Sequence, residues 1–390
     1  MTNGFALASI LRSTSSKAFP STGARPILLA VPVPENETTS TSTPPAPAAH
    51  KRRVRYRGTH PRRFQEKYKE HNPGRYAADV EKILAGGKTP AGSHRPICVR
   101  EIIGMLAPKP GELAVDATLG HGGHALEILR AILPGGRLFG LDVDPVELPR
   151  TEARLRGHGF PPESLIVRRT NFAGLPQFLA AENIHAVDMI LADLGVSSMQ
   201  IDNPERGFSF KHDGPLDLRM NPQRGHPASA LLATANETGL AQMLVENADE
   251  PHARLIAQAI CHARARTSIT TTKMLARHIH EALRNARRPE EEIDASIRRT
   301  FQALRIAVND EFGALETFLR HLPACLKPAG RVAILTFHSG EDRRVKKAFQ
   351  AGERDGTYVR IAGEVIRPAP EEIRANPRAS SAKLRWAVRA

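Results

Sequence analysis

The stretch from residue 187 to residue 220 constrains the fold of this chain more than any other. It begins as a short apolar run, typical of a buried strand, and breaks at Asp193 into a long loop that is rich in glycine and proline. Long ordered loops are uncommon unless they carry a function. A carboxylate at the end of a strand, followed by a polar loop with glycines, is typical of a ligand site in an α/β sheet.

Short apolar runs alternate with helical patterns along the middle of the chain, which predicts a parallel, doubly wound sheet. A helix is expected at 97–106, and another follows the turn at 118–124. A last strand at 383–388 is expected to lie antiparallel at the sheet edge. The other expected strands lie at 113–117, 137–144, 165–169, 187–192 and 332–337.

The gap between residues 195 and 331 is far longer than a single crossover helix requires, and it contains several helical patterns. We therefore expect an α/β, Rossmann-like sheet with an inserted helical subdomain. The expected organisation is a disordered tail at 1–50, a basic arm at 51–90, a sheet domain at 91–204 and 301–390, and an inserted substrate-recognition subdomain at 205–300.

The charge of the chain favours a polyanionic partner. It contains 55 Lys and Arg against 41 Asp and Glu, with a pI near 10.1. In the arm, basic residues are interleaved with Tyr56, Phe64 and Tyr68. Basic groups bind phosphates and aromatic rings stack on bases, so the arm is expected to contact RNA. A solvated charge run without a partner fits the same residues equally well.

The N-terminal segment leaves the compartment open. Residues 1–34 contain no Asp or Glu but include Arg12, Lys17 and Arg25. An organellar transit peptide is one interpretation, and a disordered tail is the one we favour. Three widely spaced cysteines indicate a reducing compartment, and no apolar run is long enough for a membrane span. We expect a cytoplasmic protein without a membrane partner, or one of an organelle matrix if the transit peptide exists.

A glycine-rich turn separates the first expected strand from its helix. Gly120, Gly122 and Gly123 allow the backbone to approach a ligand closely, and a helix N-terminus offers free N–H groups. The spacing differs from the GxGxxG fingerprint, so a nicotinamide cofactor is disfavoured.

Further candidates follow the ends of the expected strands. Asp142 could accept hydrogen bonds from both ribose hydroxyls of a nucleoside, and Phe172 could stack on a purine. Asp116 could orient the glycine loop or a cationic group. The alternatives are that the acids are merely solvated and that Phe172 belongs to the core. Together these residues predict an adenosyl pocket, and S-adenosylmethionine, whose sulfonium cation suits nearby carboxylates, is the expected cofactor.

Several motifs resemble one family, the MraW family of small-subunit ribosomal RNA methyltransferases. The resemblance runs from about His94 to the C-terminus. It implies a methyltransferase that modifies N4 of a cytidine in the decoding region of 16S ribosomal RNA. The motifs that carry it are residues 116–124 (DATLGHGGH), 191–198 (LADLGVSS), 205–220 (ERGFSFKHDGPLDLRM), 299–309 (RTFQALRIAVN), 336–339 (TFHS) and 376–385 (NPRASSAKLR).

The resemblance also implies which residues bind the cofactor. The family's cofactor loop falls on Gly122, Gly123 and His124, its ribose-binding acid on Asp142 and its aromatic residue on Phe172. Further cofactor contacts fall on Asp193 and Gln200. The chain departs from the family pattern at Gly340, where a leucine is usual, and at Asn203, where an aspartate is usual. Residues 349–366 form a shorter segment than in many relatives, which puts any substrate contact there in doubt.

Methyl transfer to an exocyclic amine needs a hydrogen-bond acceptor that takes up positive charge as it develops. Asp193 is the first catalytic candidate, and holding the methionine amino group of the cofactor is its equally weighted alternative role. Asp213 and Asp217 are weaker candidates. In-line transfer needs no metal, and His338 is expected to be a structural hydrogen-bonding residue. A zinc site at His94 and Cys98 would lack a second ligand pair.

The target base must leave its stack to reach the methyl group. Phe208 and Phe210 are expected to stack on it, with Asp213 nearby, while Arg206 and Arg219 are expected to hold phosphates. Arg305 and the cluster at 343–347 are expected to extend the RNA surface.

Two competing functions remain open at this point. One is a non-catalytic assembly factor of the small ribosomal subunit that retains the fold; the intact glycine loop, Asp142 and Asp193 argue against it. The other is a methyltransferase acting on adenine N6 or on DNA, which commonly carries an Asp/Asn-Pro-Pro-Tyr/Phe motif where this chain has Asp193-Leu-Gly-Val. The oligomeric state is open, and a dimer is one option.

Overall fold

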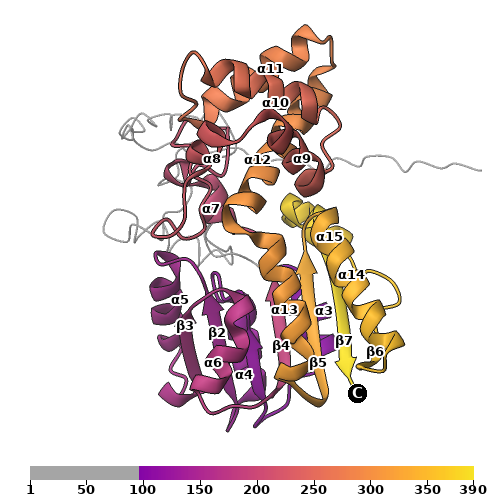
Figure 1. Ribbon diagram of the computed structural model, residues 1–390. Helices are drawn as coiled ribbons and strands as arrows, with labels where there is room; N and C mark the ends of the chain where they lie inside the picture. Colours follow the sequence, from indigo (N-terminus) through magenta and orange to yellow (C-terminus); the bar gives the residue numbers. More distant parts are fainter. Residues whose placement is uncertain (1–95) are drawn as a thin grey trace, which may run out of the picture. The chain divides into compact units, whose positions relative to one another are not determined.

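The computed structural model of the chain describes residues 96–390 (Figure 1). The predicted tail at 1–50, the basic arm at 51–90 and His94 lie outside the described residues. Within residues 96–390, each helix is too short or too polar to cross a bilayer.

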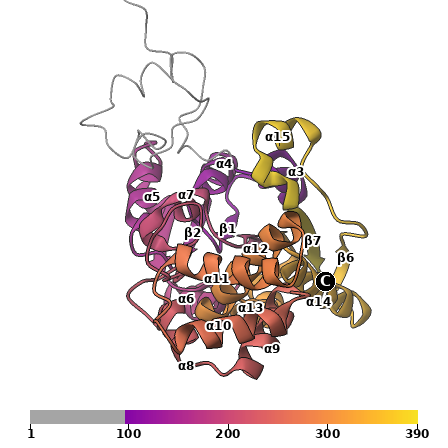
Figure 2. The same ribbon diagram turned by 90° about the horizontal axis from the view of Figure 1, so that it is seen from above.

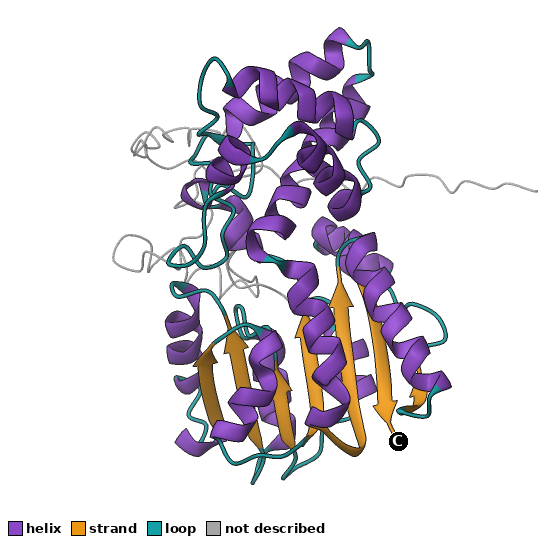
Figure 3. Ribbon diagram, in the orientation of Figure 1, coloured by secondary structure: helices purple, strands orange, loops and turns teal. Residues whose placement is uncertain are grey.

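A seven-stranded sheet with the order β3-β2-β1-β4-β5-β7-β6 forms the centre of the fold (Figure 3). The first five strands are parallel, and β7 pairs antiparallel with both β5 and β6. The strands are β1 (Leu113–Asp116), β2 (Arg137–Asp142), β3 (Leu165–Arg169), β4 (Val187–Asp193), β5 (Leu326–Thr336), β6 (Tyr358–Ile361) and β7 (Lys383–Arg389). The predicted parallel, doubly wound sheet is confirmed. The expected edge position of β7 is wrong, because β6 covers its outer side.

Helices cover both faces of the sheet, as Figure 2 shows along the strands. Alternate strand residues supply the two cores: Val115 and Phe139 face one layer, while Ala114 and Leu138 face the other. This period of two follows from the pleat of a strand. One layer contains α6 (Leu175–Ala181), α13 (Glu311–Cys325) and α14 (Ser339–Arg354); the other contains α3 (Val99–Leu106), α4 (Gly123–Ile132), α5 (Glu147–Arg156) and α15 (Pro370–Ala375).

The long gap after β4 contains helices with a hydrophobic core of their own. Leu240, Ile256, Leu275 and Ile297 are among its buried members. The helices are α7 (Ser198–Asp202), α8 (Ala228–Thr234), α9 (Glu237–Ala248), α10 (Ala253–Arg264), α11 (Thr272–Asn285) and α12 (Glu290–Asn309). In Figure 1 they gather beyond the carboxyl ends of the parallel strands. The domain boundary expected at residue 300 falls inside α12, which continues through a single left-handed residue, Asp310, into α13.

Short 3₁₀ turns complete the chain: η2 (Pro162–Ser164), η3 (Phe172–Gly174), η4 (Pro204–Arg206) and η5 (Pro377–Ser381). The strand order reverses between β1 and β4, which are hydrogen-bonded neighbours although α4, β2, α5, β3 and α6 separate them in the chain. Such a reversal leaves a crevice at the carboxyl ends of the strands, where ligands of α/β sheets bind.

Candidate functional site

A cavity of about 430 Å³ opens at this crevice. Its volume suits a nucleoside-sized ligand. The walls come from the loops that follow β1, β2, β3, β4 and β5, from the end of α12 and from η5. The lining includes Gly120, Gly122, Gly123, His124, Asp142, Asp144, Phe172, Asp193, Gln200, Met220, Arg305, Asn309, Glu311, Phe337 and Glu341.

The loop after β1 holds its shape through carboxylates at the ends of two strands. Asp116 accepts a hydrogen bond from the Thr118 amide at 3.1 Å, and Asp142 accepts one from the Gly120 amide at 2.7 Å. Gly122 is the N-cap of α4 with a φ of 69°. A Cβ atom there would lie 2.9 Å from Cγ2 of Thr151, so the position needs glycine for both its conformation and its space.

The ends of β2 and β3 form the adjoining wall. The second oxygen of Asp142 accepts a hydrogen bond from the Asp144 amide at 2.8 Å. Burial raises the pKa of Asp142, although the two amide N–H groups work against that shift. The Phe172 ring packs edge-on against Phe318, with centroids 5.3 Å apart, yet it also lines the cavity. Phe172 therefore packs against the core and also lines the cavity, and its stacking on a purine stays a prediction.

Asp193 ends β4 and contributes a carboxylate to the same cavity. Its side chain is 30% exposed, and its Oδ1 atom is buried without a hydrogen-bond partner in residues 96–390. Burial, together with the nearby carboxylates of Asp116 and Glu341, raises the pKa of Asp193 to about 8. Burial also raises the pKa of Asp116 to about 7, with Asp142 adding to the effect. A cationic ligand group would relieve this crowding of carboxylates.

Two glutamates that we did not predict line the cavity, and one of them, Glu341, lies near Asp193. Glu341, only 3% exposed, accepts a hydrogen bond from the Phe337 amide at 2.8 Å and pairs with Nε2 of His338 at 3.2 Å. Glu311 binds Arg305 through two hydrogen bonds of 2.8 and 2.9 Å. Burial opposes ionisation of Glu341, but His338, Arg305 and the Phe337 amide outweigh it and lower its pKa. Each glutamate lies in the first turn of a helix, where an acid usually indicates no more than favourable helix-dipole electrostatics.

Glu311, His338 and Glu341 place their ligand atoms within 4.8 Å of one another, a spacing that could hold a metal ion. Two of these groups already have other partners, because Glu311 binds the guanidinium of Arg305 and Nδ1 of His338 accepts a hydrogen bond from the Glu341 amide. His338 also serves as the N-cap of α14. It therefore has the structural hydrogen-bonding role that we expected.

The structure brings all seven predicted cofactor residues to the cavity. Gln200 is fixed there through both ends of its amide. Its Oε1 accepts a hydrogen bond from the Ser197 amide at 2.8 Å in a capping box, and its Nε2 donates to Asp144 at 2.8 Å. The seven are Gly122, Gly123, His124, Asp142, Phe172, Asp193 and Gln200.

The five predicted substrate residues occupy other positions and do not belong to the cavity lining within residues 96–390. Phe208 is 8% exposed in the core of the inserted helices, and Phe210 packs on Phe301 with centroids 5.4 Å apart. Phe208 is therefore better explained as a core residue than as a stacking platform, because its ring is not available to a base.

The two arginines and Asp213 also have local partners. Arg206 binds Asp144 at 2.8 Å, and Arg219 binds Asp217 at 2.7 and 2.8 Å. Asp213 is exposed and accepts a hydrogen bond from the Lys273 amide at 3.2 Å, at the start of α11. Arg305, which we had assigned to the outer RNA surface, lines the cavity instead.

The residues present fit S-adenosylmethionine. Asp142 and the glycine loop suit the ribose and the backbone of such a ligand, Phe172 suits its purine, and the unpartnered oxygen of Asp193 suits a cationic or amine-bearing group. The arrangement can hold a methyl donor at one end of the cavity and a methyl acceptor beside Asp193.

Comparison with known proteins agrees with this chemistry. A sequence model of the MraW methylase family matches residues 91–390. Ribosomal RNA small subunit methyltransferase H 2 of Alkaliphilus metalliredigens is 54% identical over 344 residues, covering 87% of this chain and 97% of the relative. Ribosomal RNA small subunit methyltransferase H 1 of Lachnoclostridium phytofermentans is 51% identical over 344 residues, covering 87% of this chain and 93% of the relative. Both alignments take in more of the chain than residues 91–390.

Proposed function

The chain belongs to the MraW methylase family, and we propose that it transfers the methyl group of S-adenosylmethionine to N4 of a cytidine in small-subunit ribosomal RNA. The observation that carries this proposal is the unpartnered Oδ1 atom of Asp193 in the cavity that also contains the glycine loop and Asp142. An exocyclic amine has N–H groups that such an oxygen can accept. The named relatives, which are ribosomal RNA small subunit methyltransferases, support RNA as the acceptor.

S-adenosylmethionine supplies the electrophilic methyl group. Asp142 and Phe172 would hold its ribose and purine, and the loop at 120–124 would bind its remaining part. These assignments extend the contacts that the same residues make around the cavity.

Asp193 would accept a hydrogen bond from the cytosine amine and orient it for in-line attack. Once N4 has accepted the methyl group that S-adenosylmethionine would supply, the Asp193 carboxylate would take up the proton that the amine loses. Positioning and charge stabilisation of this kind supply most of the rate in such transfers. Glu341 and Arg305 would complete the acceptor end, since both line the cavity, with Glu341 near Asp193 and Arg305 near Glu341.

Two further expectations depend on parts of the chain outside the described residues. We propose that the basic arm at 51–90 contacts RNA, and the alignments that extend beyond residue 91 toward the N-terminus support a shared role for it. We propose that the chain acts in the cytoplasm, where small ribosomal subunits are assembled; imaging of the tagged full chain would test this against an organelle matrix.

Small ribosomal subunits from a strain that lacks this enzyme provide the test. We expect the purified chain to transfer a labelled methyl group from S-adenosylmethionine to these subunits, and nucleoside mass mapping to find one new N4-methylcytidine. Cofactor binding without transfer would contradict the proposal and favour the assembly-factor alternative. Methylation of another base would contradict the assigned acceptor.

A further inference from the structure

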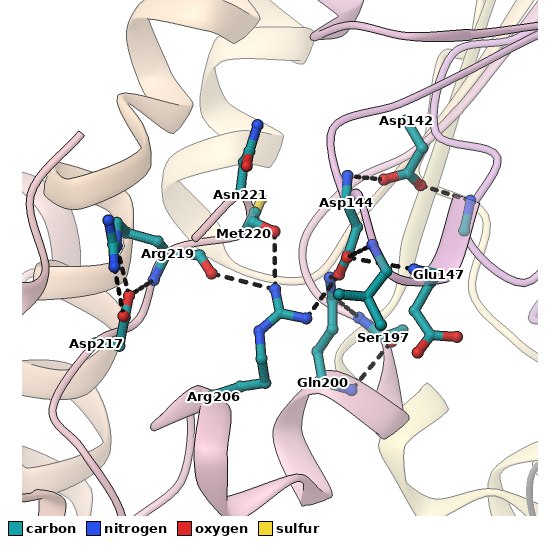
Figure 4. A network of polar contacts seen from close by, with 12 residues as sticks. Asp142, Asp144, Glu147, Ser197, Gln200, Arg206, Asp217, Arg219, Met220 and Asn221 are labelled. Atoms are coloured by element: carbon teal, nitrogen blue, oxygen red, sulfur yellow. Dashed lines mark hydrogen bonds and ion pairs between the residues drawn. The ribbon is translucent and has the colours of Figure 1, made fainter. Parts of the chain in front are cut away.

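A buried polar junction joins two walls of the cavity (Figure 4). At its centre is Asp144, 1% exposed, whose carboxylate accepts four hydrogen bonds. One oxygen accepts from the amides of Val146 and Glu147, at the start of α5. The other accepts from Nε2 of Gln200 and from Nη1 of Arg206, both at 2.8 Å.

Arg206 links Asp144 in this wall to the loop at 217–221. Its second amino group, Nη2, donates to the Met220 carbonyl at 2.7 Å and to the Arg219 carbonyl at 3.2 Å. Met220 lines the cavity, and its amide is held from the other side by Asn309 of α12 at 2.7 Å. Figure 4 shows the guanidinium lying between Asp144 and the carbonyls of this loop.

The geometry requires an arginine. A guanidinium presents donors in a rigid fork, so one amino group can bind a carboxylate while the other binds carbonyls. The ammonium of a lysine is a single point charge at the end of a flexible chain. Because the Arg206 side chain is only 12% exposed and both of its amino groups are used, it cannot also serve as the phosphate ligand that we expected.

Under the proposed function, on which this inference rests, one of the joined walls binds the cofactor and the other lies beside the methyl acceptor. Asp144 follows Asp142 and belongs to the cofactor wall, together with Gln200. Met220 is the last residue of the motif at 205–220. Asn309 binds the backbone of Met220 and Leu218, which places this loop next to the acceptor end. We infer that Arg206 is a positioning residue, which fixes the loop at 217–221 to the cofactor wall so that the methyl acceptor is held in register with the methyl donor.

Substitution of Arg206 has two separable consequences. Arg206→Gln leaves the buried charge of Asp144 unpaired, which lowers stability whatever the role of the arginine. Arg206→Lys keeps a cation beside Asp144 and so preserves the electrostatic balance, but its single ammonium cannot reproduce the two bonds to the carbonyls of Arg219 and Met220.

The test compares these variants with wild type by thermal midpoint, affinity for S-adenosylhomocysteine, and kcat and KM on small subunits that lack the methyl group. In Arg206→Lys we expect the thermal midpoint to lie closer to wild type than that of Arg206→Gln, the affinity for S-adenosylhomocysteine to stay close to wild type, and the KM for subunits to be raised about tenfold or more. Arg156→Gln is the matched control, because Arg156 also joins a carboxylate, Glu152, to two backbone carbonyls, but away from the cavity.

Recovery of KM together with the thermal midpoint in Arg206→Lys would overturn the inference, since it would leave Arg206 with a purely stabilising role. An equal rise of KM in Arg156→Gln would also overturn it. A wild-type chain that binds S-adenosylhomocysteine but methylates no subunits would instead overturn the proposed function, and the inference with it.

Discussion

Nδ1 of His124 lies 3.7 Å from Oδ2 of Asp193, so the first turn of α4 and the end of β4 meet across the cavity. Nε2 of the same ring lies 2.9 Å from the Ile97 carbonyl. A carbonyl only accepts, so Nε2 donates this hydrogen bond, and the ring lies between the Ile97 carbonyl and the Asp193 carboxyl group.

The first prediction concerns Asp193→Asn. An amide cannot take up the amine proton, so we expect kcat to fall by about 100-fold or more, while the affinity for S-adenosylhomocysteine changes less. Methyl incorporation into small subunits and calorimetric titration with S-adenosylhomocysteine measure the two effects. Asp188→Asn is the control, because Asp188 lies on the same strand but bonds to Leu113 and Lys327 at the far end of the sheet. Unchanged turnover and unchanged cofactor affinity in Asp193→Asn would remove Asp193 from the site.

The same substitution should raise stability. The folded chain holds the Asp193 proton up to about pH 8, whereas an unfolded aspartate loses it near pH 4. The folded state therefore binds more protons between these values, and the stability contributed by Asp193 falls as pH rises through that range. We expect the thermal midpoint of Asp193→Asn to exceed that of wild type by an amount that grows from about pH 4 to about pH 8. A constant difference across that range would show that another group causes it.

Catalysis should follow the opposite trend with pH. The carboxylate of Asp193 accepts a proton only when ionised, so kcat/KM at low cofactor concentration should increase with pH, reach half its maximum near pH 8 and level off above it. The titratable groups near Asp193 within residues 96–390 include Asp116, Glu341, His124 and Cys98. A cationic cofactor favours the carboxylate, so the profile of kcat at saturating S-adenosylmethionine should level off at a lower pH. Methyl incorporation measured from about pH 6 to about pH 9.5 would test both profiles. A profile that falls over this range would contradict the role of Asp193 as proton acceptor.

The sheet and the cofactor wall could be predicted because their signals are local. Buried parallel strands appear as apolar runs, and the residue after each run must lie at one edge of the sheet, which placed Asp142 and Asp193 correctly at the cavity. The acceptor side depends on tertiary partners. Nothing near Arg206 in the sequence shows that Asp144 will bind it, and nothing near Phe208 shows that inserted helices will bury it. Glu341 was missed for the same reason, since only the fold brings it beside Asp193.

The fourth prediction separates the effect of a glycine's left-handed conformation from the effect of the side chains packed around it. Gly122 and Gly159 both have positive φ, at 69° and 78°, but only at Gly122 would a Cβ atom meet Thr151 and Leu155. Gly159→Ala should therefore cost about 1 kcal/mol of unfolding free energy, the cost of the left-handed conformation alone. Gly122→Ala should cost more and should also weaken S-adenosylhomocysteine binding, because it moves the cofactor loop. Urea unfolding and calorimetric titration measure these effects. Equal losses of stability in the two variants would contradict the close packing at Gly122.

The last prediction concerns Asp142→Asn. Both oxygens of Asp142 accept backbone hydrogen bonds, from Gly120 and from Asp144, and an asparagine can accept with only one of its two polar atoms. The NH₂ group would face a backbone N–H, so either the glycine loop or the loop after β2 must move. We expect the affinity for S-adenosylhomocysteine to fall by about tenfold or more, since the ribose would also lose an acceptor.

Binding of adenosine, a fragment of the cofactor, distinguishes a direct contact of Asp142 with the ribose from an effect through the glycine loop. Adenosine should lose affinity for Asp142→Asn to about the same extent as S-adenosylhomocysteine, because both carry the ribose that Asp142 would bind. Asp188→Asn again serves as the control and should bind both ligands as wild type does, since Asp188 lies at the opposite end of β4 from the cavity. If adenosine bound Asp142→Asn as tightly as wild type while S-adenosylhomocysteine did not, Asp142 would act through the glycine loop and not on the ribose.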